Sequence, residues 1–159
     1  MTKVWILISG VALLSSVAPA AQSGGRPETI FQCSFGKKQV AVRAVGPMYV
    51  YSFGLPGHPE VEVVGDPKRK NVYASDSVGT LDMIRQVRLQ NGRFSYVVFY
   101  GGLTKAYATP SATAGSGLAV FDGSRRIAKF SCKSGRGFQA GWDPSNLPEE
   151  DYSDYDASS

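Results

Sequence analysis

The chain has 159 residues and is poor in the side chains that do most enzyme chemistry: one histidine, two cysteines, three methionines and two tryptophans. Structural zinc usually takes four nitrogen or sulfur ligands, so one histidine and two cysteines make a poor set. The longest apolar run, Val4–Val17, is shorter than the ~20 residues that a membrane-spanning helix needs. No catalytic or cofactor motif stands out. The sequence therefore predicts no catalytic residue, no metal site and no cofactor.

Residues 1–20 have the three regions of an export signal. Lys3 supplies a positive start, Val4–Val17 an apolar stretch, and Ala18-Pro19-Ala20 a cleavage site with small residues. We therefore expect residues 1–20 to be a cleaved signal peptide and residues 21–29 to be a linker. The mature protein is expected to be periplasmic or secreted.

Export decides how Cys33 and Cys132 are interpreted. Two cysteines in an oxidising compartment usually form a disulfide, whereas in the cytosol they more often stay reduced. Cys33 lies in the first expected strand and Cys132 in the last. The predicted bridge would close a loop of about a hundred residues and join the two ends of the domain.

Charge is distributed unevenly along the chain. Residues 21–142 contain 16 lysines and arginines against 7 acidic residues, whereas residues 143–159 contain six acids and no base. The end of the chain has too little apolar surface to offset the entropy of ordering it. We expect residues 134–159 to be a disordered acidic tail. A further hypothesis is that this tail folds back on the basic body and competes with a partner.

Within residues 30–133, apolar residues recur with a period of two, which is typical of strands. The dipeptide Asn91-Gly92 lies between two such runs and predicts a hairpin with a two-residue loop. That loop places Leu89 opposite Phe94 and Val87 opposite Tyr96, all on one face.

A second hairpin is expected at Asp122-Gly123. Its register stays open, because a two-residue loop pairs Ile127 with Leu118 and a three-residue loop pairs it with Ala119.

The rest of the domain is expected to be short strands joined by breaks and two long loops. Strands are expected at Ile30–Phe35, Gln39–Val45, Met48–Phe53, around Val61 and Val63, at Gly117–Phe121 and at Arg125–Cys132, and a break at Gly54–Pro59. Asp66–Thr80 and Lys105–Ser116 are interpreted as long loops. Roughly seven or eight strands predict an all-β domain over residues 30–133, a small antiparallel β-barrel or sandwich closed by one disulfide.

Basic side chains are the candidate binding residues. They are Lys68, Arg69, Lys70, Arg85 and Arg88. Gathered on one face, they would attract an acidic protein, anionic lipid or nucleic acid. Export argues against nucleic acid.

The two segments that contain the cysteines resemble a known family. Phe31-Gln32-Cys33, followed by a short basic turn, and the closing Phe130-Ser131-Cys132 resemble the layout of small exported bacterial proteins such as the periplasmic c-type lysozyme inhibitors. The resemblance implies a compact antiparallel barrel that blocks a muramidase cleft with loop residues. The Ser-Gly-x-Arg/Lys-Tyr inhibitory loop of that family is missing, and Ala74–Gly79 does not reproduce it. No inhibitory residue is therefore carried over.

These observations favour an exported, non-enzymatic binding protein, such as an inhibitor or immunity-type partner of an envelope enzyme, whose partner is another exported protein. One alternative is a small hydrolase using His58, or a ligand carrier with a barrel mouth lined by Tyr49, Tyr51, Tyr96 or Tyr100. Another is an envelope-surface protein that binds anionic groups through its basic body.

Overall fold

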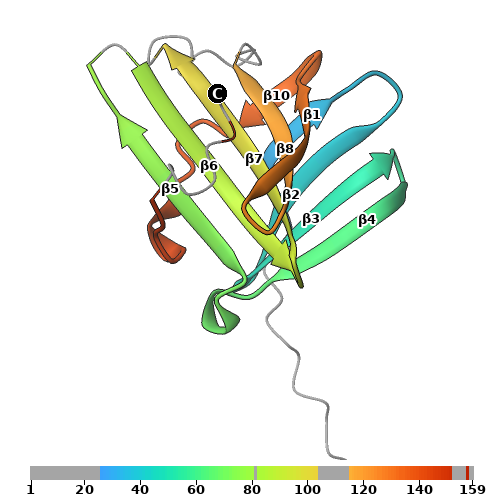
Figure 1. Ribbon diagram of the computed structural model, residues 1–159, viewed down its shortest axis with the longest axis horizontal. Helices are drawn as coiled ribbons and strands as arrows, with labels where there is room; N and C mark the ends of the chain where they lie inside the picture. Colours follow the sequence, from blue (N-terminus) through green and yellow to red (C-terminus); the bar gives the residue numbers. More distant parts are fainter. Residues whose placement is uncertain (1–25, 81, 104–114, 152–156, 158–159) are drawn as a thin grey trace, which may run out of the picture.

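The computed structural model describes residues 26–80, 82–103, 115–151 and 157, and the predicted signal peptide lies outside them. Within these ranges the chain forms ten strands in two antiparallel sheets (Figure 1). The first sheet has the order β10 (Ser134–Phe138), β1 (Glu28–Ser34), β2 (Gln39–Val45), β3 (Met48–Leu55) and β4 (His58–Gly65). The second has the order β5 (Val72–Val78), β6 (Asp82–Asn91), β7 (Phe94–Leu103), β8 (Ser116–Asp122) and β9 (Arg125–Ser131). The all-β prediction is confirmed, with more strands than expected.

Two short 3-10 turns complete the described secondary structure: η1 (Pro67–Arg69) and η2 (Pro144–Asn146). Among the residues that the structure describes, no helix has the length and apolar character needed to cross a membrane.

Glycine sets three of the hairpin turns. Their two-residue loops are Gly46-Pro47, Gly92-Arg93 and Gly123-Ser124, and the three glycines have φ of 58°, 59° and 60°. Positive φ at the first loop position is the requirement of a type II′ turn, which matches the right-handed twist of the flanking strands. Each glycine would leave open space around an added Cβ atom, so the backbone conformation alone demands glycine there.

The β6–β7 hairpin keeps the predicted faces and changes the predicted register. Leu89 lies opposite Tyr96 instead of Phe94, and Val87 lies opposite Val98. The two-residue loop is Gly92-Arg93 instead of Asn91-Gly92, so each residue of β6 pairs with the residue two positions later in β7 than expected. A shift of two leaves every side chain on its original face, so the apolar alternation alone could not detect it.

The β8–β9 hairpin has neither of the two registers considered. Val120 pairs with Ala128 and Phe121 pairs with Arg126, with a bulge between them. Ile127 is therefore the extra residue of the bulge. A one-residue insertion of this kind cannot be recognised from alternation.

Two segments expected to lack strands contain them. The expected break at Gly54–Pro59 is a continuous hairpin, in which β3 ends at Leu55, the turn is Pro56-Gly57 and β4 begins at His58. The expected loop Asp66–Thr80 contains η1 and β5. Three consecutive polar residues, Ser75–Ser77, interrupt the apolar alternation of β5, and its strand conformation comes from backbone pairing with β6 and from burial of Val72 and Ala74.

The main core fills the space between the two sheets. The second sheet contributes Val87, Leu89, Val98 and Tyr100, and the first contributes Ile30, Phe31, Val40, Val42 and Tyr51. The rings of Tyr51 and Tyr96 lie 4.9 Å apart across this space. Tyr51 and Tyr100 are buried in the core, and so is Tyr49. Burial, assisted by Tyr96, raises the pKa of Tyr51 far above its usual range.

The predicted disulfide is present between Cys33 and Cys132, with their Cα atoms 5.5 Å apart. Cys33 lies in β1, and Cys132 lies between β9 and β10, where the chain leaves the second sheet for the first. The bridge thus joins the two sheets, and it is compatible with an exported protein.

The folded region extends past the predicted domain end at residue 133. β10 pairs with β1, for example Phe138 with Phe31, whose rings meet edge to face at 4.8 Å. The expectation of a disordered tail from residue 134 onward is therefore wrong for the described residues 134–151. Apolar partners supplied by β1 explain this, because the segment alone has too few apolar residues to fold.

Candidate functional site

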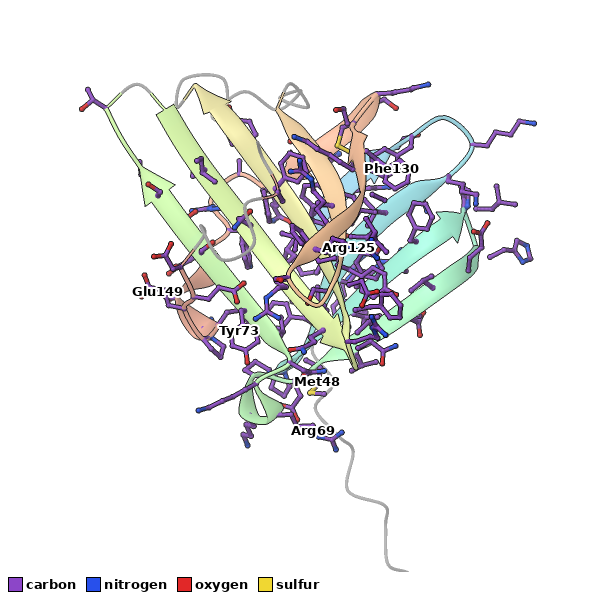
Figure 2. All side chains as sticks on the ribbon, viewed as in Figure 1. Met48, Arg69, Tyr73, Arg125, Phe130 and Glu149 are labelled. Carbon is purple, nitrogen blue, oxygen red and sulfur yellow. A yellow bond between two sulfur atoms is a disulfide. The ribbon has the colours of Figure 1, made fainter. Side chains whose placement is uncertain are left out.

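The segment that follows β10 lies along the edge strand β5. We call residues 142–151 together with residue 157 the C-terminal strap. The Ala74 N–H donates to the Pro148 carbonyl at 3.0 Å, and the Glu150 N–H donates to the Ala74 carbonyl at 3.1 Å. Ala74 and Glu149 form a parallel bridge. The strap thereby satisfies backbone groups that an edge strand otherwise leaves unpaired. Figure 2 labels Glu149 of the strap beside β5.

The strap begins on the inner face of the second sheet. Leu147 is buried in the main core, and the Trp142 ring stacks on Phe138 with ring centroids 5.6 Å apart. Asp143 starts η2 by accepting hydrogen bonds from the backbone N–H and the hydroxyl of Ser145, both at 2.9 Å. These bonds favour the ionised form and lower the pKa of Asp143.

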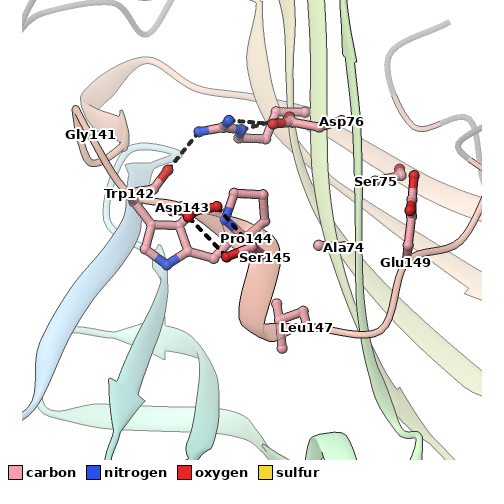
Figure 3. A pocket seen from close by; sticks show the side chains of 11 residues that line it. Ala74, Ser75, Asp76, Gly141, Trp142, Asp143, Pro144, Ser145, Leu147 and Glu149 are labelled. Carbon is pink, nitrogen blue, oxygen red and sulfur yellow. Dashed lines mark hydrogen bonds and ion pairs between the residues drawn. The ribbon is translucent and has the colours of Figure 1, made fainter.

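Arg85 holds the beginning of the strap from β6. It lies directly opposite Asp76 on β5, and its Nε donates to the Asp76 carboxylate at 2.6 Å. Its Nη1 donates to the Trp142 carbonyl at 3.0 Å, and the guanidinium lies 5.7 Å from the centre of the Trp142 ring. In Figure 3 a dashed line at the labelled Trp142 marks this hydrogen bond. One arginine therefore links the edge strand to the strap.

Arg88 holds the strap on the opposite, outer face. Its Nε lies 2.9 and 2.8 Å from the two carboxylate oxygens of Glu150, and its Nη2 also donates to that carboxylate. The guanidinium stacks over the ring of Tyr73 at 4.2 Å. The side chains of Arg88 and Glu150 are only 7% and 12% exposed, so the pair is largely withdrawn from water.

A second contact on the outer face comes from Ala157. Its N–H donates to Oε1 of Gln86 at 3.1 Å, and its methyl group is fully buried. It packs in a small apolar cluster with Val97, Phe99, Ala119 and Phe121. The strap therefore has contacts on both faces of the second sheet and runs along the edge of β5 between them (Figure 1).

A recess of about 640 Å³ lies where the strap meets β5. Polar groups in its lining include Asp76, Arg85, Asp143, Ser145 and Glu149, with Trp142 as an aromatic wall (Figure 3). The Ser145 hydroxyl donates to the Asp143 carboxylate, and the lining includes no histidine that would act as its base. Across the residues described, no group of three His, Cys, Asp or Glu side chains is placed to hold a metal ion.

The structure does not bring the five predicted basic residues onto one surface. Lys68 and Arg69 in η1 and Lys70 just after it are exposed beyond the end of β4, where Figure 2 labels Arg69. Arg85 and Arg88 are buried on opposite faces of β6 and form ion pairs. The reason is the strand period of two, which sends side chains three positions apart to opposite faces.

His58 lies at the start of β4 and is exposed opposite Leu55, in the β3–β4 hairpin. Tyr49 is one of the tyrosines expected at a barrel mouth. It is buried and also borders a separate recess of about 430 Å³.

Sequence reasoning missed the acidic partners of the two buried arginines. Glu150 belongs to the predicted tail and Asp76 to a predicted loop. The available signal was Trp142 and Leu147, two large apolar residues close to the acidic run. Such residues favour docking of a segment that is otherwise too polar to fold.

No family model, curated protein or solved structure matches the chain. The resemblance to lysozyme inhibitors therefore stays a prediction.

Proposed function

We propose that this chain is an exported, non-enzymatic binding protein that holds a segment of another exported protein along strand β5. One observation carries the proposal: β5 already pairs through its backbone with a segment of the same chain, Pro148–Glu150 of the C-terminal strap. Addition of a strand to an exposed sheet edge is a common mode of peptide recognition.

The scaffold around β5 supports a binding role. The Cys33–Cys132 disulfide joins the two sheets, and β5 pairs along its whole length with β6. A surface that is rigid before binding loses less entropy when a partner docks. In the nearby recess Asp143 is hydrogen-bonded to Ser145 and Arg85 to Asp76, which favours a structural role for these four side chains.

Site-specific photo-crosslinking tests the proposal. A photoreactive residue replaces Val78, at the end of β5, in the full chain, and the control carries it at Val64 in β4. These side chains are exposed by 62% and 50%, so neither replacement disturbs the core. Exposure of both variants to envelope extract of the producing organism should crosslink one partner at position 78 and not at position 64. Equal crosslinking at the two positions, or none, contradicts the proposal.

A second candidate function is attachment to an anionic envelope surface. It is favoured by three consecutive exposed basic residues in and just after η1: Lys68, Arg69 and Lys70. Binding to anionic vesicles that weakens with salt, and that is lost when all three become glutamine, is the expected result. Vesicle binding that persists in the triple variant removes this candidate.

A further inference from the structure

Resting on the proposed function, we infer that the partner segment is an extended acidic peptide that takes the place of the C-terminal strap, with a carboxylate on Arg88. The strap is then the built-in competitor for this surface. The chain thus regulates its own binding of an acidic partner.

The backbone contacts of the strap define the shape of the partner. Ala74 both donates to and accepts from the strap, to Pro148 and from Glu150. Main-chain hydrogen bonds of this kind do not depend on side-chain identity, so any extended segment can form them. They provide affinity without selecting a sequence.

Arg88 defines the charge of the partner. Its guanidinium is buried and forked onto the Glu150 carboxylate, with Gln90 Oε1 3.3 Å from Nη1. A buried guanidinium that loses its carboxylate is strongly destabilised, because neither water nor a neutral side chain fully replaces the ion pair. A neutral segment on β5 would leave Arg88 in this state. The surface therefore selects segments that bring a glutamate or aspartate.

Ala157 defines a second side chain that the partner should supply. Ala157 is fully buried against Val97, Phe99, Ala119 and Phe121, and its N–H is bonded to Gln86. A methyl group fills this position without an unpaired polar atom. We expect the partner to place a small apolar residue there, after its acidic residue.

Occupation by the strap lowers the apparent affinity for a partner. The partner binds only the fraction of molecules whose strap is displaced, so the measured dissociation constant rises in proportion. Weakening the strap alone should therefore tighten partner binding, without any change in the surface itself.

The test uses the full mature chain with Glu150→Gln, which removes the carboxylate that pairs with Arg88. The probe is a fluorescent synthetic peptide with the sequence of residues 147–157, Leu-Pro-Glu-Glu-Asp-Tyr-Ser-Asp-Tyr-Asp-Ala. Fluorescence anisotropy should show the probe binding Glu150→Gln about tenfold or more tightly than wild type, a factor typical of one charge-assisted hydrogen bond. The matched control is Glu149→Gln, which loses the same charge without touching Arg88 and should bind as wild type does.

Two further measurements decide the chemistry. On Glu150→Gln, a probe with glutamine at the position of residue 150 should bind at least about tenfold more weakly than the acidic probe. The acidic probe should likewise bind the double variant Arg88→Gln/Glu150→Gln at least about tenfold more weakly than it binds Glu150→Gln. Equal binding of the two probes, or no probe binding by a folded Glu150→Gln chain, overturns the inference. If circular dichroism shows that Glu150→Gln is unfolded, Glu150→Asp replaces it with the same expectations. If a partner crosslinks at position 78 and an excess of the acidic probe does not reduce that crosslinking, the proposed function stands and only this inference is removed.

Discussion

Removal of the disulfide should lower stability mainly through the unfolded state. Cys33 and Cys132 are 99 residues apart in sequence, and a loop of about this length corresponds to ~4.7 kcal/mol in the chain-entropy model. The double variant Cys33→Ala/Cys132→Ala keeps the native ladder between β1 and β10, including the pair Cys33–Gly135, so the folded structure should persist. We therefore expect a loss of about 3–5 kcal/mol, and a melting temperature lower by about 10–20 °C.

Urea denaturation followed by circular dichroism measures this change. Reduced wild type serves as the control, because it lacks the bridge but keeps the sulfur atoms of Cys33 in the core and of Cys132 against it. The free energies of unfolding of reduced wild type and of the double alanine variant should agree within about 1 kcal/mol, since both lose the same constraint on the unfolded chain. A loss smaller than about 1 kcal/mol in both forms would refute the reasoning, because the bridge would then contribute nothing to the unfolded ensemble.

Three further predictions concern single residues. Gly92→Ala should cost about 1 kcal/mol in urea denaturation, because its φ of 59° disfavours a side chain, whereas Gly92→Asn should cost less. Burial and the neighbouring Tyr96 raise the pKa of Tyr51, so stability should be complete below pH ~10 and fall above it. Urea denaturation between pH 9 and 11 should show a smaller fall for Tyr51→Phe than for wild type. Phe31→Ala should cost about 3–5 kcal/mol and Phe130→Ala clearly less, since their side chains are 0% and 41% exposed; equal losses would contradict this.

Alternation predicted the strands whose apolar residues face the core. Gln39–Val45 is β2 with the expected bounds, and the faces of the β6–β7 hairpin are as expected. Register was not predictable there, because a shift of two residues preserves both faces. Strand β5 was missed because edge strands need few apolar residues, and Val72–Val78 has little apolar alternation.

The candidate site was predicted only in part. Arg85 and Arg88 were singled out for their charge, and the hypothesis of an acidic tail folding back agrees with the Arg88–Glu150 pair. Their placement on opposite faces follows from the strand period once β6 is known. Their partners were not predictable, because Asp76 and Glu150 approach only after β5 and the strap have docked on β6.

The sequence by itself determined the all-β class, the disulfide and the contrast between a basic body and an acidic end, because each depends on composition or on a local period. Only the tertiary structure decided that Trp142, Leu147 and Glu150 belong to the folded domain. A segment with few apolar residues cannot order itself, and it folds here because β5, Arg85 and Arg88 supply the partners that its own sequence lacks.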